Sequence, residues 1–145
     1  MKIFSYILIW ALCTSTPGGY ADTRPITSAE FAVESISRFE LRRIYFMKDR
    51  WLDGVGLVTL YQRPLHSDAH LRFIRETLGL TPAAYFKELA LAVNVGKGLV
   101  ITVVGSDDDM IDKVTAKDNA IGYLDVDTII VTLDKTTKLL KVTDE

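Results

Sequence analysis

Apolar and polar positions alternate along this chain in a pattern that predicts strands and helices in turn. Short apolar runs rich in β-branched residues lie at 55–61, 99–104, 120–124 and 128–133, and each predicts a strand, the first two of them buried. Between them, apolar residues recur every three or four positions, as on the buried face of an amphipathic helix. Strands that alternate with helices favour an α/β fold with a mixed sheet flanked by helices.

The chain also marks where its helices begin. The N-terminal signals are Ser37 with Glu40 as a capping box, Ser67, Thr81–Pro82, and Ser106 followed by Asp107, Asp108 and Asp109. Acids in a first turn suit the positive end of the helix dipole, and Gly79 is expected to end the second helix. The residues expected to face inward are Leu41, Ile44, Tyr45, Leu71, Ile74, Leu78, Tyr85, Phe86 and Leu89, with Arg42 and Arg43 on a solvated face.

Two further strands and several turns complete the predicted order. Residues 31–33 predict a short first strand, and 138–142 predict a last strand that forms an antiparallel hairpin with 128–133. Asp53-Gly54 predicts a turn before the strand at 55–61. Gly96-Lys97-Gly98 predicts a tight turn and is not a Walker loop, because the longer glycine spacing of such a loop is absent.

The first 21 residues predict a secretory signal peptide. Lys2 is their only charge, an apolar run follows over 3–12, and small residues flank Tyr20 before a cleavage site after Ala21. The run is too short to span a bilayer, and the residues before Cys13 make a poor lipoprotein signal. We expect 22–28 to be a flexible leader and 29–145 to be a single lobe.

Composition narrows the classes of function. The net charge of −2 gives no support for nucleic acid or an anionic membrane as a partner. The only cysteine, Cys13, lies in the predicted signal, so the exported chain forms no disulfide. There is no G-x-S-x-G motif and no pair of carboxylates beside a base. We therefore expect a protein that is not an enzyme and that carries no cofactor.

Four motifs, in order, resemble those of a known family. They are the run 39–48, then Trp51 with Asp53-Gly54, then Gly96-Lys97-Gly98, and last the strand 120–124, which reads Ala-Ile-Gly-Tyr-Leu. Together they cover most of the chain after the signal. They resemble the periplasmic phosphate-binding proteins of phosphate ABC importers.

The resemblance implies a fold and a location. Those binding proteins have two lobes of the type II periplasmic-binding-protein fold, and this chain resembles one of them, with a mixed sheet flanked by helices. It implies export to the periplasm and a binding role rather than catalysis. It also implies that an anion site on this lobe would need a second copy of the chain or another envelope protein to close over it.

The resemblance places the candidate anion site in the turn from strand to helix that contains Arg63 and Ser67. In the family, an arginine, a serine hydroxyl and the first N–H groups of the helix bind phosphate, so Arg63, Ser67, Asp68 and Ala69 are the candidate ligand-binding residues. Asp68 and Ala69 stand where the family has glycine and threonine. His66 replaces another glycine.

Asp68 leaves two interpretations open. A guanidinium and a helix N-terminus both favour an oxyanion, but two like charges about 4 Å apart repel by roughly 4 kcal/mol at an effective dielectric near 20. Asp68 could turn outward, pair with Arg63 or Arg72, or cap its own helix. The site then either binds phosphate or a related oxyanion, or is a ligand-free remnant on a lobe that serves protein contacts in the cell envelope.

Two other clusters are weighed and set aside. His66 and His70 have the spacing of a two-histidine metal site, but no third ligand lies nearby and an exposed turn is the simpler interpretation. Asp107, Asp108 and Asp109 lack the alternating spacing of a calcium loop. We expect no metal. Trp51 and Tyr123 are expected to pack in the core or at the edge of the lobe.

Overall fold

A computed structural model describes residues 23–94, 101–125, 128–129 and 135–144. The first half of the fold consists of β1 (Thr23–Ser28), β2 (Ser35–Ser37), α1 (Arg38–Tyr45), β3 (Trp51–Leu52), β4 (Gly56–Leu57) and β5 (Thr59–Gln62). The second half consists of α2 (Asp68–Arg72), the π-helical turn η1 (Phe73–Thr77), α3 (Pro82–Asn94), β6 (Ile101–Val103), α4 (Asp107–Thr115), β7 (Ala120–Asp125), β8 (Thr137–Leu139) and β9 (Lys141–Thr143).

The main sheet is mixed, which confirms the predicted fold class. Its five strands run in the order β6-β5-β7-β1-β8. Strand β5 pairs in parallel with both β6 and β7, whereas β1 pairs antiparallel with β7 and with β8. Two small sheets accompany it, the parallel pair β2-β9 and the antiparallel hairpin β3-β4.

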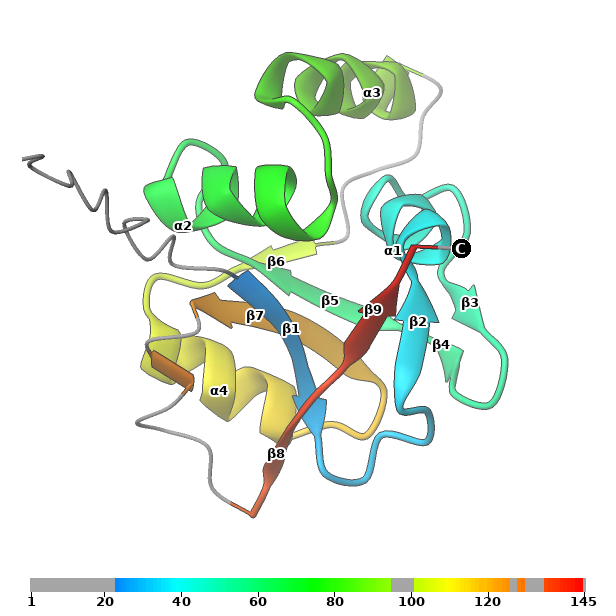
Figure 1. The fold of residues 1–145 in the computed structure, drawn as a ribbon, viewed down its shortest axis with the longest axis vertical. Helices are drawn as coiled ribbons and strands as arrows, with labels where there is room; N and C mark the ends of the chain where they lie inside the picture. The colour runs from blue at the N-terminus through cyan, green and yellow to red at the C-terminus, as the bar shows by residue number, and fades with distance from the viewer. Residues whose placement is uncertain (1–22, 95–100, 126–127, 130–134, 145) are drawn as a thin grey trace, which may run out of the picture.

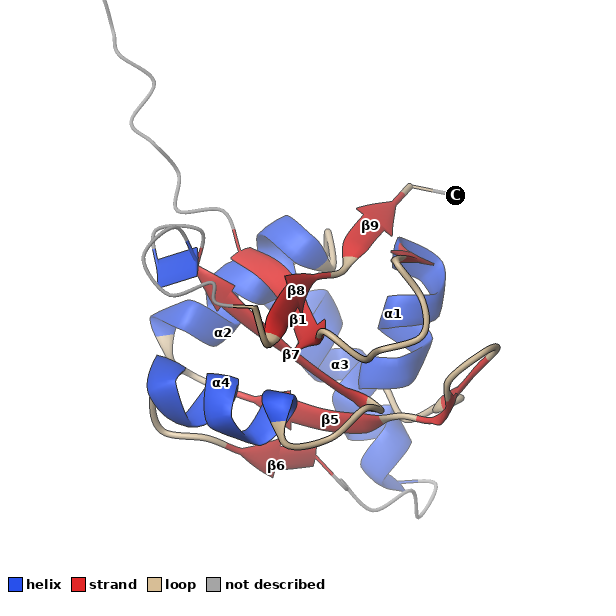
Figure 2. Ribbon diagram, turned by 90° about the horizontal axis from the view of Figure 1, so that it is seen from below, coloured by secondary structure: helices blue, strands red, loops and turns tan. Residues whose placement is uncertain are grey.

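Helices cover both faces of this sheet, as Figures 1 and 2 show. On one face α1, η1 and α3 pack over Leu60, Ile121 and Tyr123. On the other face α4 packs over the neighbouring residues of the same strands. Met110 and Val114 are the residues of α4 that make this contact. The alternation of side chains along β5 and β7 therefore divides the core into two clusters.

The predicted helix starts are confirmed. Ser37 and Glu40 form both bonds of a capping box, and Ser106 Oγ accepts the Asp109 N–H. Of the nine inward positions, Leu71 and Phe86 are half-buried and the other seven are buried. Gly79 ends the second helical segment with a φ of 65°. Within the described residues, every helix is too short or too polar to cross a bilayer.

The flexible leader expected at 22–28 is wrong over its described part, because residues 23–28 form strand β1. This strand lies between β7 and β8, and five of its six residues are buried. Its first residue is tied to the second helical segment, since Thr23 Oγ1 and Thr77 Oγ1 share a hydrogen bond of 2.7 Å. The sequence pattern missed the strand because Ile26 is its only large aliphatic residue.

Three other predicted strands need correction. Residues 31–33 form an irregular segment with a bend at residue 32 rather than a strand, although Phe31 is buried. The run 55–61 is divided into β4 and β5, since Gly54 and Gly56 take positive φ in the hairpin that Asp53-Gly54 begins. The strand expected at 99–104 is present as β6. It lies at the edge of the main sheet and is largely exposed, whereas a buried strand was expected.

The predicted C-terminal hairpin is also wrong in its described part. Residues 128 and 129 are helical, and 130–134 lie outside the described residues. The last strand is two strands, β8 and β9, whose partners come from the start of the chain. Strand β8 pairs with β1 and β9 pairs with β2, so the antiparallel part of the sheet is made by long-range pairing.

Helix α4 approaches the sheet closely at Gly122. A Cβ atom placed on Gly122 would lie 2.5 Å from Met110 Sδ and 2.7 Å from Val114 Cγ2. Both distances are far below van der Waals contact, so any side chain here would push α4 off β7. The glycine of the strand 120–124 therefore serves helix–sheet packing.

We predict that Gly122→Ala lowers the free energy of unfolding by about 1–3 kcal/mol through overpacking. Chemical denaturation followed by far-UV circular dichroism measures this. Gly105→Ala is the matched control, because an added Cβ there meets nothing within 4 Å. Equal effects of the two substitutions would contradict the packing argument.

Candidate functional site

The candidate site lies at the carboxyl end of the parallel strands. The chain leaves β5 for α2 and α3 on one face, and it leaves the adjacent strand β6 for α4 on the other face. Adjacent parallel strands whose connections run to opposite faces define a topological switch point, where α/β proteins commonly bind ligands. Arg63 follows β5 and Ser106 follows β6, so both residues lie at this point.

Arg63 is held at both its backbone and its side chain. Its N–H donates to the Tyr123 hydroxyl at 2.8 Å, and Nη1 donates to Asp107 Oδ1 at 2.7 Å. The side chain is only 18% exposed. Its Nε is buried and has no hydrogen-bond partner among the residues that the structure describes, so the guanidinium keeps donor capacity that these residues do not use.

Asp107, and not Asp68, is the ion-pair partner of Arg63. The other oxygen of Asp107 accepts from Thr128 Oγ1 at 3.0 Å, and its side chain is 33% exposed. Of the alternatives left open for Asp68, pairing with Arg63 is therefore wrong, and the exposed position of Asp68 agrees with a side chain turned outward. From the sequence, Asp107 could be recognised only as an acidic residue in the first turn of a helix. Its contact with Arg63 joins β5 to α4 across 44 positions, and no local pattern of residues predicts such a contact.

Ser67, Asp68 and Ala69 form the start of α2. The Ser67 hydroxyl donates to the Pro64 carbonyl at 2.7 Å and accepts the His70 N–H at 3.3 Å, which confirms the predicted N-cap. Asp68 is exposed. The N–H groups of Asp68 and Ala69 belong to the first turn, where a helix has no internal acceptor.

His70 is buried, which corrects its assignment to an exposed turn. It is 0% exposed, and its Nδ1 shares a hydrogen bond with the Tyr123 hydroxyl while Nε2 shares one of 3.2 Å with the Tyr85 hydroxyl. His66 alone is at the surface, where its ring stacks on Phe86 at 5.2 Å. The two histidines therefore point to different environments. No group of three metal-ligating side chains occurs among the described residues.

Burial governs the titration of this cluster. Desolvation, with a smaller contribution from His66, lowers the pKa of His70 to about 4. The same cause raises the pKa of Tyr85 to about 12, and it raises the pKa of Tyr123 well above its usual value even though the Arg63 N–H opposes the shift. At neutral pH the imidazole and both phenols are uncharged.

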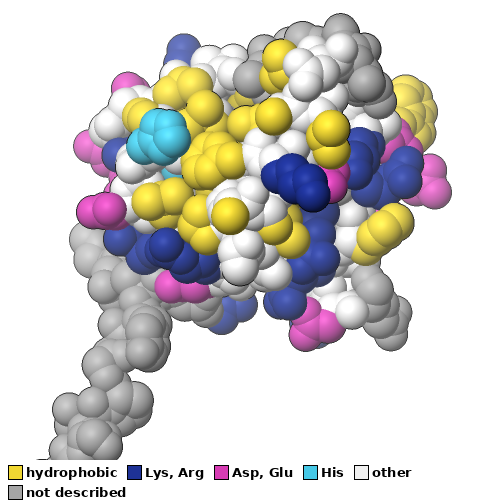
Figure 3. All heavy atoms as spheres, turned by 90° about the horizontal axis from the view of Figure 1, so that it is seen from above, with side chains coloured by type: hydrophobic (Ala, Val, Ile, Leu, Met, Phe, Trp, Pro, Cys, Tyr) yellow, Lys and Arg dark blue, Asp and Glu magenta, His cyan; other side chains and the backbone are white. Residues whose placement is uncertain are grey.

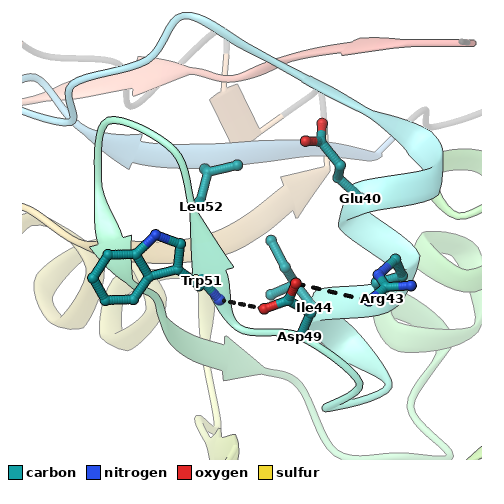
Figure 4. Close-up of a pocket in the computed structure, with 6 residues that line it drawn as sticks. All are labelled: Glu40, Arg43, Ile44, Asp49, Trp51 and Leu52. Carbon is teal, nitrogen blue, oxygen red and sulfur yellow. Dashed lines mark hydrogen bonds and ion pairs between the residues drawn. The ribbon is translucent and has the colours of Figure 1, made fainter.

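The expected positions of Arg42, Arg43 and Trp51 agree with the structure to different degrees. Arg42 is not simply solvated, because Nε and Nη2 donate to the carbonyls of Leu78 and Gly79 at the end of the second helical segment. Arg43 is partly exposed and pairs with Asp49 at 3.7 Å. Trp51 is 65% exposed beside these residues, at the mouth of a small pocket shown in Figure 4.

Tyr123 is buried in the core, as expected, and its ring stacks on Phe73 at 3.8 Å between centroids. The loop Gly96-Lys97-Gly98 lies outside the described residues. On the side of α3, Figure 3 shows hydrophobic side chains gathered across one face with Lys and Arg at their border. Leu91 and Val93 of α3 are among the exposed apolar residues of the chain.

Comparison with solved structures places this fold among phosphate-binding proteins. An ABC-type phosphate transport receptor from Vibrio cholerae matches with a TM-score of 0.61 and 16% identity, over 83% of this chain and 46% of its own. PstS from Borrelia burgdorferi matches at 0.64 and 20%, over 84% and 47%. A protein from Clostridium perfringens described as a phosphate ABC transporter substrate-binding protein, solved with bound phosphate, matches at 0.61 and 17%, over 83% and 44%.

These likenesses confirm the expected resemblance at the level of fold. The chain spans less than half the length of the proteins it matches, as one lobe of a two-lobed protein would. No family model matches the sequence, and no curated protein matches it by sequence.

The buried imidazole makes stability depend on pH. Because the pKa of His70 is about 4 in the fold and about 6.5 when unfolded, the unfolded chain binds more protons between these values. The contribution of neutral His70 is complete above pH 6.5 and is lost as the pH falls towards 4, amounting to about 3 kcal/mol.

We therefore predict that stability measured by denaturation falls between pH 6.5 and 4, and that His70→Asn reduces this dependence relative to the unsubstituted chain. His66→Asn, at the exposed histidine, is the control and should change the slope much less, because His66 is only the smaller cause of the lowered pKa of His70. An identical slope in the His70 variant would show that carboxylates alone cause the loss.

Proposed function

We propose that this chain is an exported solute-binding lobe that binds phosphate or a related oxyanion at the turn from Arg63 to Ala69. The observation that carries the proposal is the position of Arg63. Its guanidinium lies at the switch point beside the N-terminal ends of α2 and α4, and its Nε is buried without a partner in the described part of the chain. Helix N-termini and guanidinium groups both favour an anion.

The expected ligand contacts follow from the free donors at this point. Arg63 would offer Nε and its remaining N–H groups, and Asp68 and Ala69 would offer backbone N–H groups. Ser67 already donates its proton to the Pro64 carbonyl, so in this proposal it orients the turn and caps α2. This assigns Ser67 a different role from that of a donor to the ligand.

Asp107 favours phosphate over sulfate in this proposal. An anion that reaches Arg63 also approaches the carboxylate that pairs with Nη1 at 2.7 Å. A protonated phosphate oxygen can donate to that carboxylate, whereas sulfate has no proton at neutral pH and meets only repulsion. The site therefore suits an oxyanion that carries a hydroxyl group.

Two features make binding by this chain weak. Asp107 already compensates the charge of Arg63, and the exposed Asp68 adds a second negative charge at the turn. The chain also corresponds to less than half of the proteins it resembles. A second copy of the chain or another envelope protein would complete the enclosure of the anion.

The first test is thermal unfolding of the chain from Asp22 onward, with millimolar phosphate or with sulfate at equal ionic strength. We expect phosphate alone to raise the midpoint, and a ligand at 100 times its dissociation constant stabilises by about 2.7 kcal/mol. Circular dichroism is the suitable signal, because the indole of Trp51 is largely exposed.

Substitutions assign the effect to the turn. Arg63→Ala should abolish the phosphate-induced rise, and Asp68→Ala should enlarge it by removing a like charge. Arg75→Ala, at an exposed cation on the same helical segment, is the matched control and should behave as the unsubstituted chain. A phosphate response that survives Arg63→Ala would exclude this site.

Export is a separate part of the proposal, supported by the signal-like residues 1–21 and by the resemblance to periplasmic proteins. Expressed with its signal in a Gram-negative cell, the chain should appear in the periplasm with Asp22 as its first residue. Mass spectrometry of the intact protein measures this. An uncleaved chain, or one carrying lipid on Cys13, would contradict it.

A second candidate function is a ligand-free lobe that makes protein contacts in the cell envelope. The exposed apolar residues of α1 and α3, namely Phe39, Leu91 and Val93, favour it, because such surface commonly marks an interaction site. It predicts no change of the unfolding midpoint with either anion. The same thermal experiment therefore separates the two candidates.

A further inference from the structure

We propose that the buried pair His70–Tyr123 positions Arg63 at the mouth of the anion site, so that both are positioning residues for ligand binding. The inference rests on the proposed function and adds to it the buried groups that set the geometry of the turn. The linking contact is the hydrogen bond of 2.8 Å from the Arg63 N–H to the Tyr123 hydroxyl. Arg63 is the first residue after β5, so this bond determines where the chain leaves the sheet.

The network joins four elements around the turn. Tyr123 lies on β7, Arg63 follows β5, His70 lies on α2 and Tyr85 on α3. The hydroxyl of Tyr123 contacts both the Arg63 N–H and His70 Nδ1, and His70 Nε2 contacts the Tyr85 hydroxyl at 3.2 Å. The distance from Arg63 to the first turn of α2 is thus set through a single phenol oxygen.

The donors and acceptors of the network are consistent with one arrangement. The Tyr123 oxygen accepts the Arg63 N–H, so its own proton is available to His70 Nδ1. A neutral imidazole then carries its proton on Nε2 and donates to the Tyr85 oxygen. Each link from Arg63 to α3 has a donor and an acceptor, and burial makes an unpaired member costly.

A second anchor keeps α2 from turning about this network. Arg72 binds Asp125 of β7 through two bonds, Nε to Oδ1 at 3.2 Å and Nη2 to Oδ2 at 2.6 Å. Helix α2 is therefore held to β7 at two places, by His70 through Tyr123 and by Arg72 through Asp125. Two attachments to one strand fix the direction in which its N-terminus points, and this is what an anion-binding turn requires.

Tyr45 supplies a matched comparison. It is buried like Tyr123, and its hydroxyl also bonds to the backbone near the end of β5. This hydroxyl donates to the Tyr61 carbonyl at 3.2 Å. It does not contact Arg63 or α2 in any of the described hydrogen bonds. Removal of the Tyr45 hydroxyl takes one buried hydrogen bond from the core and removal of the Tyr123 hydroxyl takes two, but only the loss at Tyr123 reaches the site.

The experiment compares Tyr123→Phe with Tyr45→Phe in the chain from Asp22 onward. Phosphate affinity is measured by NMR titration at a temperature where all variants are folded, and amide hydrogen exchange of Arg63 is measured on the same samples. We expect Tyr123→Phe to weaken phosphate binding about tenfold, the effect of losing the one hydrogen bond that holds the Arg63 backbone, and to speed exchange at Arg63. Tyr45→Phe should lower the unfolding midpoint and leave the affinity within about twofold.

A pair of His70 variants keeps the test independent of folding defects. His70→Asn retains an acceptor close to the position of Nδ1 and should preserve most of the affinity. His70→Leu removes it and should reproduce the loss seen with Tyr123→Phe. Rescue by Asn distinguishes positioning from simple filling of space, because Leu fills the cavity better than Asn does.

The outcomes separate this inference from the proposed function. If the unsubstituted chain gives no phosphate response, the anion site itself fails and the inference fails with it. If that chain binds phosphate and Tyr123→Phe binds it equally well while losing stability, the network is structural only and the inference alone is overturned. A loss of affinity in Tyr123→Phe, with Tyr45→Phe unchanged, supports it.

Discussion

A phenol oxygen buried between a sheet and its helices is the point on which this structure depends. Tyr123 has its ring stacked on Phe73 and its hydroxyl in contact with Arg63 and His70. A buried hydroxyl must find partners or cost free energy, and here the partners come from β5 and α2. Satisfying one polar atom therefore brings together the strand end and the helix start that form the candidate site.

The same constraint explains why the imidazole stays neutral. His70 is enclosed by aromatic side chains, with Tyr85 and Phe73 near its ring, and desolvation lowers its pKa to about 4. A neutral imidazole is both a donor and an acceptor, so it can connect two phenols in series. A protonated one could only donate, and the chain from Arg63 to Tyr85 would lose its acceptor.

Charge around Arg63 decides what the site can bind. The fold places Asp107 of α4 against Arg63 and Asp125 of β7 against Arg72, so each of these two cations has its own carboxylate. This arrangement stabilises the empty lobe and lowers the attraction for a fully charged anion. In the proposed function, an anion that approaches Arg63 would therefore need to carry a proton or to be enclosed by a partner. Helix α4 approaches β7 closely at Gly122. This packing keeps Asp107, in the first turn of α4, against Arg63.

The sequence by itself determined the local features. Capping residues such as Ser37, Ser67 and Ser106 act through neighbours three positions away, so their pattern was sufficient to place helix starts. The α/β class and the position of Arg63 after a strand were also readable. Only the tertiary structure decided that residues 23–28 form an inner strand, that β8 and β9 pair with β1 and β2, that His70 is buried, and that Asp107 is the partner of Arg63. These facts depend on contacts between segments far apart in the chain, and a local pattern of residue types carries no information about which distant segment supplies the partner.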